Sequence, residues 1–395
     1  MTASAYDFES VSLDWLRAKP GVKWEDTPDA LAAWVADMDF APPPVVTAAL
    51  QAVVDVGDLG YPHWRHYTGG SGATDAWVER CAARYGWQIH EADTHEVNDV
   101  VQAIQIVLHL CTSPGDRVVV HTPAYPPFLH SVEDSGRVVL PVPAVRSAAS
   151  PTGWAFDHDA LDSALAQTPA KVLLLCHPHN PTGHVFSTEE LQSLAAIAKR
   201  HDLLIISDEI HAPLVFDRPH LPYAAASPEA ADHSITVLSA SKAWNLPGLK
   251  CAQVITTNAA DTAAWKAMPY WETVGVSTLG MEASIAAYRE GGEWLAQVVA
   301  TLAEHRDLVA QAVASWDGVT TVPNEGTYLQ WLDFTRLGLD VEPSAWLVEQ
   351  ARVESFRVRR SEIDRAQLAG LLSEAPSGSA ARRSWSQKVS QAWHA

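Results

Sequence analysis

Residues 234–250 read SITVLSASKAWNLPGLK, and this stretch decides the fold. Four of its first five residues are apolar or β-branched, which is typical of a short buried strand. The remainder holds two lysines, two serines, a proline and a glycine, which predicts a loop. A solvated loop and a binding site at the end of a strand are the two interpretations, and the neighbouring segments decide between them.

Similar apolar runs recur on both sides of this stretch. Three of them are DRVVVHTP at 116–123, AKVLLLCHPHNP at 170–181 and DLLIISDEI at 202–210. Helix-length stretches lie between them, and Ser187 with Glu190 matches the capping box that begins a helix. Apolar strands that alternate with helices predict an α/β fold with a mainly parallel central sheet between two layers of helices. In such sheets ligands bind at the carboxyl ends of the strands.

The chain has 395 residues, enough for a large domain and a smaller one. From about residue 278 the pattern becomes mainly helical before a strand-like GTYLQWLDF. We therefore expect an amino-terminal arm that forms part of a small domain at 1–45 and a large ligand-binding domain at 46–277. A connecting helix and the rest of a small α/β domain are expected at 278–395.

Composition excludes several classes of protein. The formal net charge is −20, from 27 basic and 47 acidic residues, so no basic field is available for nucleic acid or an anionic membrane. The four cysteines lack metal-ligand spacing, which favours a reducing cytoplasm. Neither a signal peptide nor a membrane span is expected. No metal site is predicted either, because His177 and His179 have no third ligand nearby in the sequence.

Polar residues follow the predicted strands where a ligand would bind. Lys242 is a candidate amine nucleophile, since burial lowers the pKa of a lysine and allows attack on a carbonyl. Asp208 follows a strongly apolar strand, where an unpaired carboxylate is costly, so a cationic ring nitrogen would suit it. Alone, Asp208 could also cap the next helix, and a Ser-x-Ser-Lys motif is weak evidence.

Three further segments add to this pattern. Asn180 begins an NPTG turn after a buried strand, and Tyr125 lies in a proline-rich turn where its ring could stack on a planar ligand or join the core. NDVVQAIQIVLHL predicts a helix that begins near Val101. The free backbone N–H groups of Gln102, Ala103 and Ile104 would then face a phosphate.

Together these motifs resemble the pyridoxal-phosphate enzymes of the aspartate-aminotransferase fold (fold type I, class I/II). The resemblance rests on Tyr125, the NPTG turn at Asn180, DEIH from Asp208 to His211, and Ser239-x-Ser-Lys242 with Lys250. WVADMDFAPPP at 34–44, LGYPHW at 59–64 and KAWNLPGLK at 242–250 resemble the cystathionine β-lyase and cysteine-S-conjugate β-lyase branch, of MalY and PatB type.

The resemblance implies roles for residues at matching positions. Lys242 would bind pyridoxal 5'-phosphate as a Schiff base and move the Cα proton, and Asp208 would hold the ring nitrogen protonated. Asn180 and His211 would lie at the phenolic oxygen, and Tyr125 would stack on the ring. Ser239, Ser241 and Lys250 would hold the phosphate with the amides of Gln102, Ala103 and Ile104. Tyr61 would reach the cofactor of a second subunit, which implies a homodimer with active sites at the subunit interface.

The resemblance also implies an activity. The expected reaction is cleavage of L-cystathionine or a related L-cysteine S-conjugate to pyruvate, ammonia and a thiol. A broad-specificity aminotransferase is an alternative, because the same site can run both reactions. A regulatory protein that keeps the fold as a scaffold is another, although Lys242, Asp208 and Asn180 argue against an inactive scaffold.

After Val353 the sequence departs from the family pattern. The family continues with a turn and an apolar strand that carries the arginine for the substrate's α-carboxylate, whereas this chain is basic and serine-rich. No such strand is expected at 353–395, and that arginine stays unassigned. Two interpretations are open: a reading-frame change near Val353, or a divergent carboxyl terminus in which Arg357 or Arg359 does the same work.

Overall fold

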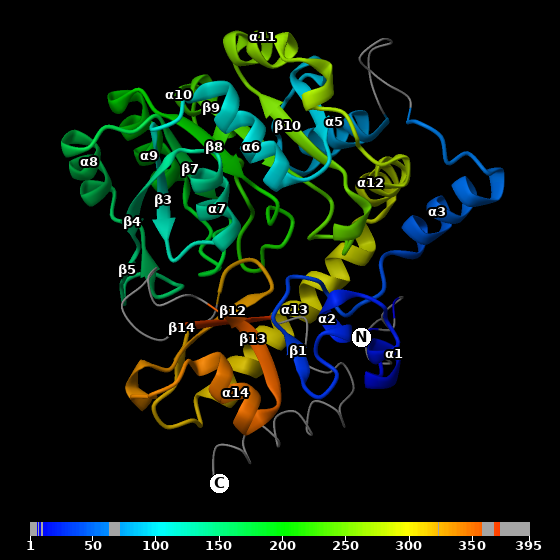
Figure 1. Cartoon of the computed structure of the whole chain (residues 1–395), viewed down its shortest axis with the longest axis vertical. Helices are drawn as coiled ribbons and strands as arrows, with labels where there is room; N and C mark the ends of the chain where they lie inside the picture. The colour runs from blue at the N-terminus through cyan, green and yellow to red at the C-terminus, as the bar shows by residue number, and fades with distance from the viewer. Residues whose placement is uncertain are drawn as a thin grey trace.

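The computed structural model describes residues 6 and 8 and residues 11–62, 72–322, 324–357 and 367–371. Figure 1 shows a large sheet with helices on both faces, and below it a smaller sheet beside a long helix. None of the helices in these ranges is long and apolar enough to cross a membrane.

The large sheet has seven strands. In spatial order they are β2 (Thr94–Val97), β10 (Ala252–Thr256), β9 (Ser234–Leu238), β8 (Leu204–Asp208), β7 (Val172–Cys176), β3 (Arg117–Thr122) and β4 (Val138–Pro143). The five strands from β9 to β4 are parallel, whereas β10 is antiparallel to both of its neighbours. The predicted mainly parallel α/β sheet is therefore confirmed.

Helices cover both faces of this sheet. They are α5 (Gly72–Tyr85), α6 (Val100–Cys111), α7 (Pro126–Asp134), α8 (His158–Gln167), α9 (Thr188–His201), α10 (Pro228–Asp232), α11 (Ala259–Ala267) and α12 (Thr278–Glu290). A further helix, α3 (Pro44–Val56), lies at the side of the molecule and packs against α12. Successive residues of a strand point to opposite faces. Val118 and Val120 of β3 accordingly pack with α6 and α7, whereas Val119 packs with α8 and α9.

The capping box of α9 is confirmed. The Ser187 hydroxyl accepts a hydrogen bond from the Glu190 N–H at 3.2 Å, and the Ser187 N–H donates to the Glu190 carboxylate at 2.7 Å. Basic residues fill the last turn of the helix, where they favour its negative end.

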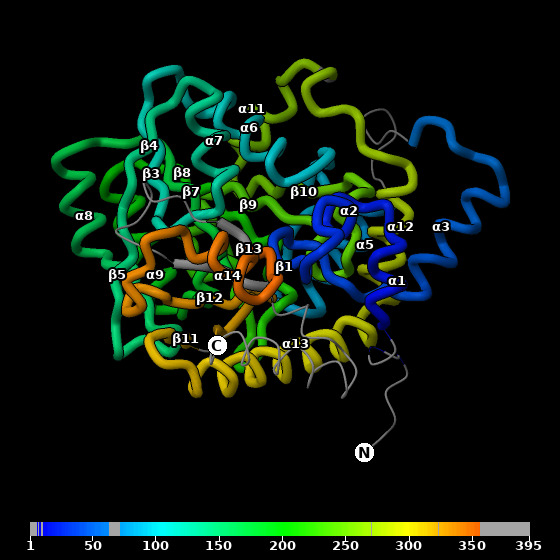
Figure 2. The backbone as a smooth tube through the Cα atoms, turned by 60° about the horizontal axis from the view of Figure 1, so that its bottom comes forward, coloured from blue at the N-terminus to red at the C-terminus, as the bar shows by residue number. Residues whose placement is uncertain are grey.

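The smaller sheet joins the two ends of the chain (Figure 2). Its order is β1 (Leu31–Ala33), β13 (Val353–Arg357), β14 (Gln367–Leu371), β12 (Leu329–Asp333) and β11 (Thr320–Thr321). Beside it lie α1 (Leu13–Arg17), α2 (Val22–Glu25), α13 (Gly292–Val313) and α14 (Pro343–Ala351). β5 (Val145–Arg146) and β6 (Trp154–Ala155) form a separate two-stranded sheet.

Short 3₁₀ turns complete the chain: η1 (Glu91–Asp93), η2 (Tyr223–Ala225), η3 (Pro247–Leu249), η4 (Tyr270–Glu272) and η5 (Thr335–Leu337). The connection after residue 278 is two helices, α12 and α13, with Gly291 between them. The domain boundaries at 45 and 277 stay a prediction.

The expected absence of an apolar strand that carries the carboxylate-binding arginine stays a prediction, but two short strands lie in this region. β13 begins at Val353 and pairs in parallel with β1, and β14 pairs with β12 and β13. Pairing with β1 from the amino-terminal arm supplies partners for a strand whose own composition is not apolar. Arg357 is the last residue of β13, and Arg359 lies outside the described residues.

Candidate active site

Four neighbouring parallel strands bring the predicted residues to one edge of the large sheet. Tyr125 follows β3, Asn180 follows β7, Asp208 ends β8 and Lys242 follows β9. These strands lie side by side in the order β9, β8, β7 and β3, with their carboxyl ends facing the smaller sheet in Figure 1. The arrangement is the one expected for ligand binding in an open α/β sheet.

Lys242 is half-buried, and its amine donates a hydrogen bond to the Ala36 carbonyl at 2.8 Å. Burial lowers the pKa of Lys242, and the nearby Asp37 and Asp208 carboxylates only partly oppose it. The amine is therefore easier to deprotonate than that of an exposed lysine, as attack on a carbonyl requires.

Asp208 is a buried carboxylate whose Oδ1 accepts a hydrogen bond from the Ile210 N–H at 3.0 Å. Burial raises the pKa of Asp208 to about 7, with Glu209 adding to the effect, and Asp208 forms no ion pair within the described part of the chain. A ligand with a protonated ring nitrogen would restore its charged form, so Asp208 fits the pyridine ring of pyridoxal phosphate.

His211 is near enough to Lys242 for the lysine charge to act on it, and Asn180 follows β7, which pairs with the strand that ends at Asp208. Burial lowers the pKa of His211 to about 3, and its Nδ1 is buried without a hydrogen-bond partner in the described chain. The Asn180 side chain is half-buried. An unsatisfied ring nitrogen that faces a site usually has a ligand as its partner, so His211 also fits a bound polar group.

Tyr125 precedes α7 as its N-cap and packs edge-on against Phe128, with ring centroids 5.6 Å apart. Burial raises the pKa of Tyr125, and the Asp208 and Asp99 carboxylates act in the same direction. The charges of Asp208 and of the residue before α6 thus both act on Tyr125.

The start of α6 differs from the prediction that its backbone amides are free donors. The helix begins at Val100, one residue earlier than expected, with Asp99 as its N-cap. The Asp99 carboxylate accepts from the Gln102 N–H at 2.8 Å, and the Asp99 carbonyl accepts from the Ala103 N–H at 3.0 Å. Ile104 lies further inside the helix. The three amides are therefore not free donors, because the acidic N-cap moves the first turn back by one residue.

Lys250 forms an ion pair with Asp99 at 2.8 Å. Burial of Asp99 opposes its ionisation, but hydrogen bonds from Lys250 and the Gln102 amide outweigh burial, and the pKa of Asp99 is lowered. A phosphate bound here would compete with Asp99 for the lysine.

Ser239 also differs from the expectation. Its hydroxyl donates to the Cys251 carbonyl at 2.6 Å and accepts from the Ser241 N–H at 3.1 Å. The hydroxyl proton of Ser239 thus stabilises the loop instead of pointing to a phosphate, while Ser241 stays half-buried beside it.

The segment 36–40 and two residues that contact it were missed as site residues. The Tyr328 hydroxyl donates to the Ala36 carbonyl at 3.1 Å, the same oxygen that Lys242 contacts. Asn245 donates to the Met38 and Phe40 carbonyls at 2.7 and 2.8 Å and accepts from the Met38 N–H at 3.0 Å. ADMDF and KAWNLPGLK were visible as motifs, but their contact was not.

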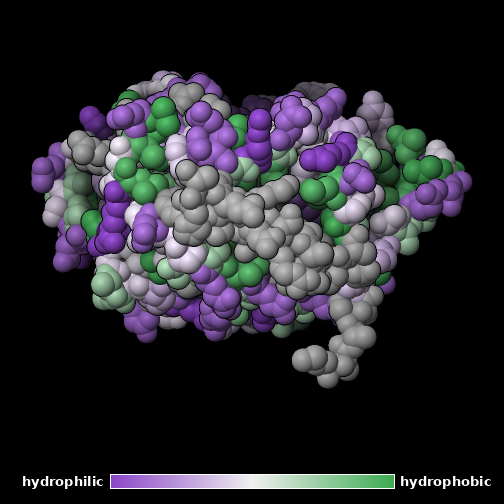
Figure 3. Space-filling view, turned by 90° about the horizontal axis from the view of Figure 1, so that it is seen from below, coloured by the Kyte–Doolittle hydropathy of each residue, from purple (hydrophilic) through white to green (hydrophobic). Residues whose placement is uncertain are grey.

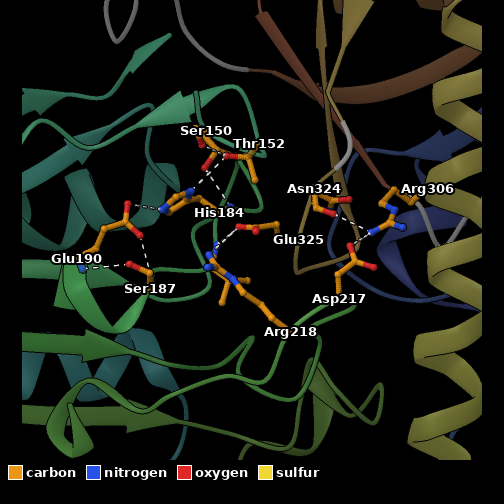
Figure 4. A network of polar contacts seen from close by, with 12 residues as sticks. Ser150, Thr152, His184, Ser187, Glu190, Asp217, Arg218, Arg306, Asn324 and Glu325 are labelled. Carbon is orange, nitrogen blue, oxygen red and sulfur yellow. Dashed lines mark hydrogen bonds and ion pairs between the residues drawn. The ribbon is translucent and has the colours of Figure 1, made fainter. Parts of the chain in front are cut away.

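Figure 4 shows how the segment before Tyr328 is fixed to the large domain. The Glu325 carboxylate accepts from Arg218 at 2.9 Å and from the Val185 N–H at 3.3 Å. Arg306 on α13 donates to Asp217 at 2.6 Å and to the Asn324 carbonyl at 3.1 Å. These contacts hold Tyr328 against Ala36.

The left part of Figure 4 is a second polar network. His184 contacts Thr152 at 3.2 Å and the Glu190 carboxylate at 3.0 Å, which extends the capping box of α9. This network connects the turn at 180–184 to Thr152 and to the start of α9.

Trp244 and Tyr61, from the motifs at 242–250 and 59–64, lie outside this group. Trp244 is buried in the core, and its indole N–H donates to the Gly291 carbonyl at 3.0 Å. Tyr61 is 88 % exposed and is not part of the buried group around Lys242. Trp64 lies outside the described residues.

The chain is similar to known enzymes over most of its length. It is 36% identical over 342 residues to the cystathionine beta-lyase of Corynebacterium glutamicum, which covers 86% of this chain and 89% of that protein. It is 33% identical to the cystathionine beta-lyase PatB of Bacillus subtilis, covering 84% of this chain and 86% of the other.

A crystal structure of a candidate PLP-dependent beta-cystathionase from Corynebacterium diphtheriae is 32% identical and has a TM-score of 0.88, covering 97% of this chain and 98% of that one. Residues 37–372 match the family described as aminotransferase class I and II. The match includes the sheet edge that carries Lys242, Asp208, Asn180 and Tyr125. The chain therefore belongs to the aminotransferase class I and II family.

Proposed function

We propose that the protein is a pyridoxal-phosphate-dependent carbon–sulfur β-lyase that cleaves L-cystathionine or related L-cysteine S-conjugates to pyruvate, ammonia and a thiol. The observation that carries the proposal is the pairing of the Lys242 amine, with its lowered pKa, and the buried Asp208 carboxylate at adjacent strand ends. The similarity to cystathionine beta-lyases over more than four fifths of the chain supports the choice of reaction.

The chain offers a partner for each part of pyridoxal phosphate. Lys242 would bind its aldehyde carbon covalently, Asp208 would hold a proton on its ring nitrogen, and Tyr125 would stack on its ring. Asn180 and His211 would contact the phenolic oxygen, and Lys250 with Ser241 would hold the phosphate. When bound, the cofactor supplies an aldehyde that captures amines and an aromatic ring that accepts the electrons of the Cα–H bond.

Lys242 has two tasks in the proposed reaction. Lys242 would hold the cofactor through its amine, and the same amine, when free and neutral, would accept the Cα proton of the substrate. The lowered pKa of Lys242 favours the neutral amine that this proton transfer requires. Asp208 would keep its negative charge beside the ring nitrogen. The Cβ–S bond then breaks with its electron pair on sulfur, the thiolate takes up a proton, and addition of one water yields pyruvate and ammonia.

The test combines a spectrum with a product assay. Purified protein with added pyridoxal phosphate should develop an absorbance band near the violet edge of the visible range and release pyruvate from L-cystathionine. Lys242→Ala should lose both. Turnover that requires 2-oxoglutarate and yields no pyruvate would instead identify an aminotransferase, the activity for which the family is named. Absence of the band in the unmodified protein would refute the cofactor assignment.

A second copy of the chain is the proposed partner. The exposed apolar residues Val54, Val56, Leu59 and Tyr61 lie at the end of α3 and just after it. Figure 3 shows hydrophobic residues gathered at the right-hand end of the molecule, where α3 lies in Figure 1. An exposed apolar patch of this kind favours a homodimer in which Tyr61 reaches the other subunit's active site.

Mixing two inactive variants tests the dimer. If Tyr61→Ala and Lys242→Ala each abolish activity, random hybrids should recover about a quarter of the normal rate, because half of the dimers hold one intact site. No recovery in verified hybrids would mean that Tyr61 serves its own subunit or none.

We expect the enzyme to act in the cytoplasm. All four cysteines, Cys81, Cys111, Cys176 and Cys251, are free thiols, as is usual in a reducing compartment.

A further inference from the structure

The position of the Lys242 amine points to a small ammonium-binding site. The amine donates to the Ala36 carbonyl at 2.8 Å, and the Tyr328 hydroxyl donates to the same oxygen at 3.1 Å. The adjacent residue, Asp37, is half-buried, and its carboxylate forms neither an ion pair nor a side-chain hydrogen bond with other described residues. A carbonyl with a free carboxylate beside it suits a group that is both cationic and a hydrogen-bond donor.

The segment that carries these acceptors is rigid. Asn245 makes three hydrogen bonds to the backbone of Met38 and Phe40. Asp39 forms a buried ion pair with Lys23 at 3.0 Å and accepts from the Trp24 indole at 2.8 Å. Asp39 is therefore paired within the arm, whereas the Asp37 carboxylate has no such partner among the described residues.

We propose that the Ala36 carbonyl, the Asp37 carboxylate and Tyr328 form a binding site for a primary ammonium group. Lys242 occupies this site with its own amine whenever it is not covalently bound. The α-ammonium group of an amino-acid substrate occupies it when Lys242 is engaged, and this second use rests on the proposed function. The Lys242 amine and the substrate amine would both have to reach the aldehyde carbon of the cofactor. One ammonium-binding site beside that carbon would serve each of them in turn.

The charges around the site are consistent with this use. Burial has the largest effect on Lys242 and lowers its pKa. Among the charged groups near Lys242, which are Asp37, Asp208 and Lys250, the Asp37 carboxylate raises the pKa most. Asp37 faces four charged groups in turn, Lys23, Lys19, Asp39 and Lys242; its pKa is raised by burial and lowered by the lysines. His211, Tyr125 and Tyr328 are the remaining titratable groups that face this side, and burial favours the neutral form of each.

The first experiment uses cofactor-free Lys242→Ala protein, in which the side chain that occupies the site has been removed. Methylammonium, followed by NMR titration, should bind with a dissociation constant in the millimolar range, about tenfold weaker when Asp37→Asn is added. Tetramethylammonium, which has no N–H donor, should not bind. The matched control is Asp29→Asn, the same change at an exposed aspartate of the arm.

The second experiment keeps Lys242 and measures how fast cofactor-free protein takes up pyridoxal phosphate as the pH changes, because only the neutral amine reacts. Removing a nearby negative charge lowers the pKa of a lysine, so Asp37→Asn should move the midpoint to lower pH by about one unit. Asp37→Glu keeps the charge and should restore the midpoint, and Asp29→Asn should leave it unchanged.

Two results would overturn the proposal: no methylammonium binding to folded Lys242→Ala protein, or an unchanged uptake midpoint in folded Asp37→Asn protein. Circular dichroism establishes that each variant is folded. Neither readout depends on turnover, so the ammonium site and the lyase activity are separable. Methylammonium binding without pyruvate release would support the ammonium site and refute the lyase activity. Pyruvate release without methylammonium binding would support the lyase activity and refute the ammonium site.

Discussion

Asn245 is the residue that connects the loop of Lys242 to the amino-terminal arm. It adopts φ +59°, a left-handed conformation that asparagine tolerates better than most residues, and its side chain makes three hydrogen bonds. Each of these bonds stabilises the fold by about 1 kcal/mol. Asn245 therefore fixes the segment that carries Ala36 and Asp37 relative to Lys242.

Asn245→Ala is expected to lower the free energy of unfolding by roughly 2–4 kcal/mol, since it removes the hydrogen bonds and adds backbone strain. Urea unfolding measures the change. Asn245→Gly removes the same bonds but permits the left-handed conformation, so it should be less destabilising by about 1 kcal/mol. Equal stability of the two variants would mean that the backbone conformation is not strained.

The sequence predicted those site residues whose position depends on local structure. Lys242, Asp208, Asn180 and Tyr125 follow recognisable strands, and parallel strands bring their carboxyl ends to one edge. Tyr328 and Asn245 could not be found in this way, because their partners lie 292 and 207 residues away along the chain. The error at Gln102 was avoidable, since Asp99 directly before an apolar helical run is a frequent N-cap.

At the scale of elements, α9 forms where its capping box predicts. The box satisfies two N–H groups that would otherwise lack partners at the start of the helix. Strands β13 and β14 show the opposite case. Their own composition did not predict them, and pairing with β1 and β12 stabilises them instead.

Ser187→Ala should destabilise the protein by about 1 kcal/mol, because it removes the N-cap of α9. Thr188→Ala changes the next residue, which is exposed in the first turn, and should have little effect. Chemical denaturation of both variants gives the comparison. A loss as large in Thr188→Ala would show that the hydroxyl of Ser187 is not the cause.

Gly183 is the point where the NPTG turn meets the segment before Tyr328. Its φ is +66°, and a Cβ atom there would lie 2.2 Å from the Asn324 Cβ and 2.8 Å from the Gly326 carbonyl oxygen. Its own carbonyl accepts from the Glu325 and Gly326 N–H groups, both at 3.0 Å. The turn therefore packs directly against the small domain.

Gly183→Ala should cost more than about 3 kcal/mol of stability, since backbone and buried side chain must both move. Gly21→Ala has no atom within 4 Å of the added carbon and is the matched control. Thermal unfolding tests the pair. A Gly183→Ala protein as stable as Gly21→Ala would contradict the close approach of the turn and the segment at 324–326.

For the whole molecule, buried histidines make the stability sensitive to acid. Burial lowers the pKa of His121 and of His177 to about 3, and that of His179 well below its ordinary value. In the unfolded chain these groups titrate near a pKa of about 6.5. At these groups the unfolded state thus binds more protons, so their contribution to stability is complete above about pH 6.5 and is lost as the pH falls toward 3. The buried Asp208 and Glu209, whose pKa values are raised to about 7, oppose this loss.

His121→Phe should weaken this dependence, because Phe fits beside Phe156 and does not titrate. Between about pH 7.5 and pH 5.5, the variant should lose about 1 kcal/mol less stability than the unmodified protein. Urea midpoints at the two pH values measure the difference. An identical loss in both proteins would mean that His121 is protonated within the fold.

The most direct measurement of the central claim is to locate the covalently bound cofactor. Protein incubated with pyridoxal phosphate is reduced with borohydride, digested and analysed by mass spectrometry. A phosphopyridoxyl group on the peptide that contains Lys242, and its absence in Lys242→Ala, is the predicted result. Labelling of Lys250 or another lysine in its place, or no stoichiometric label, would contradict the claim that Lys242 carries the chemistry.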